Sequence, residues 1–130
     1  MTKILVCGGR KYGQDPFEEA FILNVLRVLH KKTPITCVVH GGAKGADSVG
    51  GVWAHVNGVF IKKYLPDWDR YGRSAGHRRN ADMLKHNPDI ELVVAFPGGE
   101  GTAGMVKLAK NKKIEVYKPE YEQKYRGEFE

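Results

Sequence analysis

Residues Val93 to Thr102 read Val-Val-Ala-Phe-Pro-Gly-Gly-Glu-Gly-Thr, and this stretch decides the fold. The apolar run Leu92 to Phe96 predicts a buried strand, which Pro97 ends. The three glycines that follow allow backbone N–H groups to approach a ligand with no Cβ in the way. Thr102 fits the N-cap of a helix, because apolar residues follow it at helical spacing. A strand, a glycine turn and a helix N-terminus in this order favour an anion, because unpaired N–H groups and the helix dipole both attract negative charge.

The chain repeats this arrangement twice. The apolar runs Lys3 to Cys7 and Ile35 to Val39 end in Gly8-Gly9-Arg10 and His40-Gly41-Gly42, and an amphipathic helix is expected after each. Buried strands that alternate with amphipathic helices predict an α/β fold, a Rossmann-like three-layer α/β/α arrangement around a mostly parallel five-stranded sheet. If the strand order is 3-2-1-4-5, the turns after strands 1, 2 and 4 lie side by side at the carboxyl edge, where open α/β sheets bind ligands.

Local signals define the remaining elements. Asp15 and Pro16 predict the start of the first helix, Asn57-Gly58 the end of the second, and Ser74 the start of the third, which Asn87-Pro88 ends. Further strands are expected at residues 59–64, 91–96 and 114–117. The stretch from 66 to 76 reads as a long irregular loop.

Composition restricts the class of protein. The chain has 130 residues and a formal net charge of +6, which suits a polyanionic partner such as nucleic acid or a phosphorylated small molecule. Cys7 and Cys37 lie in strand-like runs and are expected to be small buried thiols, and no metal site or resident cofactor is predicted. No signal peptide or membrane-length apolar run is present, so no membrane association is expected and the location is expected to be cytoplasmic, in a cell or an infected host.

The candidate ligand-binding residues follow from these turns and from charge. Arg10 is expected at the sheet edge, where a guanidinium can fork onto a phosphate, and Trp68 and Tyr71 lie among basic residues, as for stacking on a base. Asp47 can accept from a ribose hydroxyl or hold a basic neighbour. The full set is Gly8, Gly9, Arg10, Gly41, Gly42, Ala43, Lys44, Asp47, Trp68, Arg73, Arg79, Asn80, Pro97, Gly98, Gly99, Gly101 and Thr102.

The order of these motifs resembles the YspA-like, YpsA-related branch of the SLOG superfamily. The matching stretches are Val6 to Arg10 with Tyr12, His40 to Ala43 with Gly45 to Asp47, Trp53-Ala54, Asp67-Trp68, Gly72-Arg73, Ala75-Gly76, Arg79-Asn80 with Met83, and Ala95 to Thr102. The resemblance implies a SLOG-type nucleotide-binding domain over residues 1–118 and a C-terminal tail over residues 119–130. It also implies a nucleotide-derived ligand, a homo-oligomer and a phage or plasmid association.

Two departures bear on activity. The related LOG phosphoribohydrolases carry a Glu three residues after the Thr of this motif, where this chain has Met105, which cannot act as acid or base. LOG enzymes also pair Arg with Lys in the third helix, where this chain has Arg79-Asn80. Arg79 is expected over the carboxyl edge, so that Arg79→Lys weakens ligand binding at least tenfold. The alternative is a structural ion pair of Arg79 with Asp67 or Asp69.

Three functions remain open from sequence. The first is a sensor, sequestering protein or regulator that binds a nucleotide-derived phosphorylated ligand. The second is a hydrolase that cleaves an N-glycosidic or phosphate bond, with Asp47 or Glu100 as the base. The third is single-stranded nucleic-acid binding, as in the related DprA/Smf recombination mediators, with Trp68, Tyr71, Arg70 and Arg73 as a stacking and phosphate track.

Overall fold

A computed structural model describes residues 2–119 and contains one five-stranded sheet, in which all pairs are parallel. The central strand β1 (Thr2–Cys7) pairs with β2 (Ile35–His40) on one side and with β4 (Leu92–Ala95) on the other. The strands β3 (Phe60–Lys63) and β5 (Glu115–Tyr117) form the two edges. The order β3-β2-β1-β4-β5 confirms the predicted topology.

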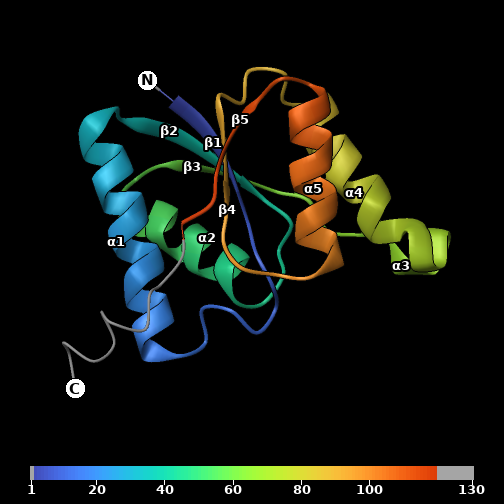
Figure 1. Ribbon diagram of the computed structural model, residues 1–130, viewed down its shortest axis with the longest axis horizontal. Helices are drawn as coiled ribbons and strands as arrows, with labels where there is room; N and C mark the ends of the chain where they lie inside the picture. Colours follow the sequence, from blue (N-terminus) through green and yellow to red (C-terminus); the bar gives the residue numbers. More distant parts are fainter. Residues whose placement is uncertain (1, 120–130) are drawn as a thin grey trace.

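Helices cover both faces of the sheet (Figure 1). The helices α1 (Pro16–Lys32) and α2 (Ala46–Val56) lie on one face, and α4 (Ala75–Lys85) and α5 (Glu100–Asn111) lie on the other. The pleat of β1 divides its side chains between the two layers: Ile4 and Val6 join the core under α1 and α2, whereas Leu5 and Cys7 join the core under α4 and α5. Burial on both faces explains why these strands read as continuous apolar runs.

The N-terminus of α1 follows the predicted capping chemistry. An Asp15 carboxylate oxygen accepts from the backbone N–H of Phe17 at 2.7 Å, and Pro16 occupies the first helical position, where no N–H is needed. Glu18, three residues after the N-cap, accepts from the N–H of Gly13 at 3.2 Å through its carboxylate. The side chain thus closes the preceding loop onto the helix.

Two expectations were wrong in detail. The N-cap of α5 is Gly99 and not Thr102, because the helix begins at Glu100, directly after the glycine pair. Thr102 therefore lies in the first turn. The stretch expected to be irregular contains α3 (Trp68–Tyr71) and the 3₁₀ turn η1 (Gly72–Ser74), with Asp67 accepting from the N–H of Arg70 to cap α3.

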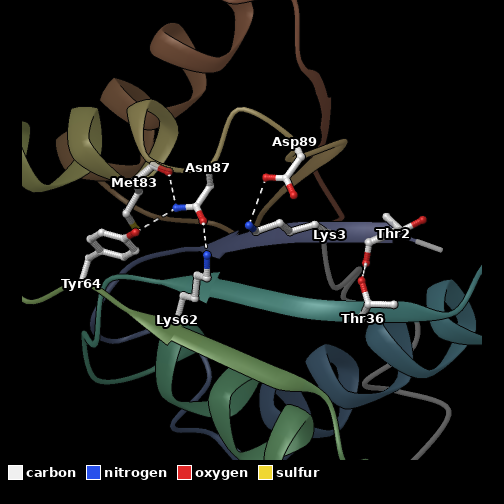
Figure 2. A network of polar contacts seen from close by, with 8 residues as sticks. All are labelled: Thr2, Lys3, Thr36, Lys62, Tyr64, Met83, Asn87 and Asp89. Carbon is white, nitrogen blue, oxygen red and sulfur yellow. Dashed lines mark hydrogen bonds and ion pairs between the residues drawn. The ribbon is translucent and has the colours of Figure 1, made fainter.

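A buried polar network holds the C-terminal end of α4 against the sheet (Figure 2). Asn87 is fully buried, and its side-chain amide donates to the carbonyl of Met83 at 2.7 Å and to the hydroxyl of Tyr64 at 3.1 Å. Its oxygen accepts from the ammonium of Lys62 at 3.2 Å. Asn87 thus follows the end of the helix, as expected, and also connects it to the edge strand β3.

Within the described range no helix is long and apolar enough to cross a membrane. Apart from Pro119, the predicted C-terminal tail lies outside the described residues. Cys7 and Cys37 are both buried and unpaired, as expected.

Candidate functional site

A cavity of about 330 Å³ lies at the carboxyl edge of the sheet. Its walls come from the loop after β1, the turn after β2, the segment from α3 to α4, and the first turn of α5. The predicted residues that line it are Gly8, Gly9, Arg10, Ala43, Asp47, Trp68, Arg73, Arg79, Asn80, Gly99, Gly101 and Thr102, together with the candidate base Glu100. The predicted residues that do not line it are Gly41, Gly42, Lys44, Pro97 and Gly98.

Close backbone packing brings the turns after β1 and β4 together. The N–H of Gly9 donates to the carbonyl of Pro97 at 2.9 Å. A Cβ on Gly98 would lie 2.6 Å from the nitrogen of Gly9, closer than real Cβ contacts, so only glycine allows this approach. Gly98 is therefore a packing residue that shapes the wall from behind.

The β4–α5 turn, residues 96–99, leaves the N-terminus of α5 exposed. Its N-cap residue, Gly99, supplies no side chain to accept from the first N–H groups of the helix. A Cβ on Gly99 or Gly101 would meet no atom within 4 Å, so the backbone here borders the cavity directly. Unpaired N–H groups together with the positive end of the helix dipole favour an anion at this place.

The β2–α2 turn, residues 41–45, has a different role. The N–H of Gly41 donates to a carboxylate oxygen of Asp47 at 2.8 Å, and the N–H of Gly42 donates to Nδ1 of His40 at 3.0 Å. The carbonyl of Gly41 accepts from Arg79 at 2.6 Å. Since these side chains already satisfy the turn, the N–H groups of Gly41 and Gly42 are not available to a phosphate.

Burial sets the charge states around this turn. Asp47 is only 5% exposed, and burial raises its pKa to about 6, although hydrogen bonds from the Gly41 and Ala43 backbone and the charge of Arg79 lower it. Burial lowers the pKa of His40 to about 4, helped by the charges of Lys63 and Arg79. His40 is therefore neutral at physiological pH, as its role as acceptor from Gly42 requires.

Arg79 connects three segments of the fold. Its Nη1 donates to the carbonyls of Gly41 at 2.6 Å and Tyr64 at 3.4 Å, and its Nε donates to Asn80 at 2.9 Å. No ion pair joins it to Asp67 or Asp69, so the expected structural alternative was wrong in its partners. The side chain still lines the cavity, and no residue between 2 and 119 accepts from its Nη2.

Arg10 and Arg73 are differently placed. Both are exposed and line the cavity, and neither side chain makes a hydrogen bond or an ion pair to another described residue. Burial lowers the pKa of Arg79; Asp47 raises it, and the nearby charge of Arg10 lowers it. An anion in the cavity would reduce this repulsion between the two guanidinium groups.

Of the two aromatic candidates, Trp68 and Tyr71, only one lines the cavity. Trp68 is 50% exposed and lines the cavity beside the first turn of α4. The Tyr71 ring instead lies under the guanidinium groups of Arg70 and Arg78, 5.1 and 4.3 Å from its centroid, and does not line the cavity. Of these two aromatics, only Trp68 is placed to stack on a ligand.

Sequence reasoning missed several lining residues, namely Cys7, Gly76, His77 and Met83. Cys7 and Met83 belong to core patterns, and no local signal separates a core residue from one at a cavity floor. Burial, with a further contribution from Asp47, raises the pKa of Cys7 to about 12, so this thiol stays neutral. Met105 also lines the cavity. No group of three or more His, Cys, Asp or Glu residues in the described part of the chain can hold a metal ion.

The fold and the position of this cavity define a Rossmann-like protein with a site at the carboxyl edge of its sheet. Residues 2–71 match the model of the YspA, cpYpsA-related SLOG family, and the chain belongs to this family. It is similar to the Gene 61 protein of Mycobacterium phage D29, with 36% identity over 89% of this chain and 94% of that protein. The crystal structure of the protein TM1055 is similar in fold, with a TM-score of 0.69 and 20% identity over 89% of this chain and 72% of that one.

Proposed function

We propose that this protein binds a nucleotide or a nucleotide-derived phosphorylated ligand in the cavity at the carboxyl edge and acts as a sensor, sequestering protein or regulator. The single observation that carries the proposal is the uncapped N-terminus of α5, which borders a cavity that Arg10 and Arg73 also line. Both arginines lack a partner in the described chain, so their charge is available to a phosphate.

The cavity also offers a place for a base. Trp68 is half exposed and lines the same cavity as the N-terminus of α5, so its ring is accessible for stacking on a planar ligand. Stacking of this kind contributes about 1–3 kcal/mol per base. The family membership supports a nucleotide-related ligand in general terms.

A thermal-shift screen tests the proposal. The panel holds the common nucleoside mono-, di- and triphosphates, cyclic dinucleotides and ADP-ribose derivatives, with the unphosphorylated nucleosides as controls. A ligand at 100 times its Kd stabilises the folded state by about 2.7 kcal/mol. If no phosphorylated member raises the melting temperature at millimolar concentration, the proposal is wrong.

Variants then locate the site. Arg73→Ala is expected to weaken binding of the best ligand about tenfold, about 1.4 kcal/mol, without a change in melting temperature, since the side chain makes no contact that the fold needs. Arg70→Ala is the matched control, because it removes the same charge from the same segment but does not line the cavity. Trp68→Ala should weaken nucleotide binding and leave inorganic phosphate binding unchanged. Equal effects of Arg73→Ala and Arg70→Ala would place the ligand elsewhere.

A hydrolase is the second candidate, and the pKa of Asp47 favours it. A carboxyl with a pKa of about 6 at the cavity wall is suited to general acid–base catalysis near neutral pH. Incubation with nucleoside monophosphates and NAD-like compounds, followed by chromatography, would detect free base or phosphate. Turnover that Asp47→Asn abolishes and Glu100→Gln leaves intact would assign Asp47 as the catalytic residue. The absence of product would exclude this activity for the compounds used.

Homo-oligomerisation, a cytoplasmic location and single-stranded nucleic-acid binding stay predictions. Size-exclusion chromatography with light scattering measures the first directly.

A further inference from the structure

A second cavity lies on the other side of the first turn of α5. Its volume is about 500 Å³, and its walls come from the end of β4, the β4–α5 turn, one side of α5 and the residue that follows β5. Phe96 and Val106 belong to its apolar floor. The ligand-binding predictions made from sequence name only Pro97, Gly98 and Thr102 of its walls, so they do not account for it.

The charged groups of this second cavity all have the same sign. They are the ammonium groups of Lys107 and Lys110, on successive turns of α5, and of Lys118, and no acidic residue of the described chain lines the cavity. The ion pair between Lys3 and Asp89 is the only one among residues 2–119, so none of the three lysines is paired with a described carboxylate. Three cations around one hollow, none with a carboxylate partner among residues 2–119, favour an anionic occupant.

The two cavities meet around the β4–α5 turn. Both are lined by Thr102. A shallow hollow in front of the turn shares Gly9, Arg10 and Gly99 with the first cavity and shares Pro97 and Gly98 with the second. The turn is thus a common wall, with the arginines on one side and the lysines on the other. The first cavity alone is at the lower end of the range of about 300–1,000 Å³ that is typical of ligand sites.

We infer that the protein binds a ligand with two nucleotide-sized units joined through phosphate, one unit in the first cavity and the second phosphate-bearing unit at Lys107, Lys110 and Lys118. The inference rests on the proposed function, because the first unit occupies the site proposed above. A 5′,5′-pyrophosphate-linked dinucleotide and a phosphodiester-linked single strand share the required chemistry, namely a second phosphate-bearing unit linked to the first through phosphate.

Calorimetric titrations of the full chain with a ligand series test this inference. The series consists of AMP, diadenosine 5′,5′-pyrophosphate, and 5′-phosphorylated deoxyadenylates of one, two and four nucleotides, with a matched thymidylate set. Affinity is expected to rise at least tenfold from the one-unit to the two-unit ligand of at least one linkage type. The linkage type that gives the rise identifies the source, since a pyrophosphate-linked ligand and a single strand are separate arms.

Two charge-matched triple variants then assign the rise to the lysine cavity. The variant Lys107→Gln/Lys110→Gln/Lys118→Gln should lose the two-unit advantage and keep its one-unit affinity. The control variant Lys31→Gln/Lys32→Gln/Lys85→Gln removes the same charge from exposed lysines that line neither the two cavities nor the shallow hollow. This variant should keep the one-unit affinity and the two-unit advantage. Circular dichroism confirms that each variant is folded.

The outcomes separate the inference from the proposed function. One-unit binding without a two-unit advantage overturns the inference alone. So does an advantage that survives in the cavity variant, or one that falls equally in both variants, because net charge would then be the cause. Failure of every phosphorylated ligand to bind overturns the proposed function and the inference with it.

Discussion

The β2–α2 turn and the β4–α5 turn have the same appearance in sequence, an apolar strand followed by a glycine pair and a helix. In the structure they differ in whether protein side chains accept from their backbone N–H groups. Asp47 and His40 accept from the β2–α2 turn, and Arg79 donates to its carbonyl, so this turn is satisfied from within the protein. At the β4–α5 turn no side chain caps the helix, and the glycines border a cavity.

The comparison shows that a glycine pair after a strand has two uses. In one turn it allows a buried polar cluster to fold the backbone tightly, and in the other it leaves backbone donors accessible to a ligand. The difference depends on the surrounding side chains. A buried carboxylate placed to accept from the turn competes with any phosphate, whereas an uncapped helix N-terminus lined by arginines attracts one.

The largest expected effect is on the β2–α2 turn, through Gly45→Ala. Gly45 has a φ of +82°, and a Cβ there would lie 2.6 and 2.7 Å from the carbonyl oxygens of Arg10 and Gly9 and would also collide with that of Tyr12. Strain and overlap together should lower the free energy of unfolding by about 3 kcal/mol or more, measured as a shift of the urea midpoint at constant m value.

Gly58→Ala is the matched control for this change. Gly58 has a φ of +66°, but a Cβ there would meet no atom within 4 Å. Only the cost of the left-handed backbone conformation remains, and it should lower the free energy of unfolding by about 1–2 kcal/mol. Equal losses in the two variants would show that the contact between the loop after β1 and Gly45 does not stabilise the protein.

Arg79→Ala is expected to lower the free energy of unfolding by about 1–3 kcal/mol, because the carbonyl of Gly41 loses its donor. Arg73→Ala, which removes a cation from the same cavity, should change stability by less than about 0.5 kcal/mol. Arg79→Lys restores one donor and should recover part of the loss. Chemical denaturation measures all three, and a stable Arg79→Ala variant would contradict the structural role of this residue.

In the first turn of α5, directly after the β4–α5 turn, the expected stability change has the opposite sign. Gly101 lies in the first turn of α5, and a Cβ there would meet no atom within 4 Å. Gly101→Ala should stabilise the protein by up to about 1 kcal/mol through helix propensity, while the added methyl group takes space in the cavity and weakens AMP binding. A loss of stability would mean that this turn is not open to the cavity.

The smallest expected effect is a pH dependence of ligand affinity. Asp47 gains its charge as the pH rises through its pKa of about 6, and a negative charge at the cavity wall repels phosphate. The AMP affinity of the wild type, relative to that of Asp47→Asn, should therefore fall about threefold between pH 5 and pH 7, a Coulomb effect below about 1 kcal/mol. Titration calorimetry of both proteins across this range provides the ratio, and a constant ratio would show that Asp47 does not face the ligand.

Asp47 and His40 have opposite effects on the pH dependence of the free energy of unfolding. Folding raises the pKa of Asp47 from 3.8 to about 6. The contribution of this carboxyl to stability is therefore present at low pH and is lost as the pH rises from about 4 to about 6. The pKa of His40 is lowered from 6.5 to about 4, so its contribution grows over nearly the same interval. Asp47→Asn should therefore reveal a steeper rise of melting temperature between pH 4 and pH 6.5 than the wild type shows.

Much of the fold was predictable because its signals are local. The apolar run 35–39 and the capping residues Asp15 and Pro16 act within a few positions of themselves, and the resulting elements leave the strand order 3-2-1-4-5 as the arrangement that brings the glycine turns together. The start of α5 was placed three residues late, because Thr102 has the chemistry of an N-cap, while the backbone after Gly99 already follows a helical path.

The sequence by itself determined the parallel sheet, the edge at which a ligand is expected and most of the residues that line the cavity there, since these follow from periodicity and from turn chemistry. Only the tertiary structure decided that the β2–α2 turn is satisfied from within, that Arg79 donates to Gly41 across 38 positions of sequence, and that three lysines surround a second hollow. The physical reason is that a donor or a charge is free or occupied according to its neighbours in space, and those neighbours come from distant segments that no local pattern brings together.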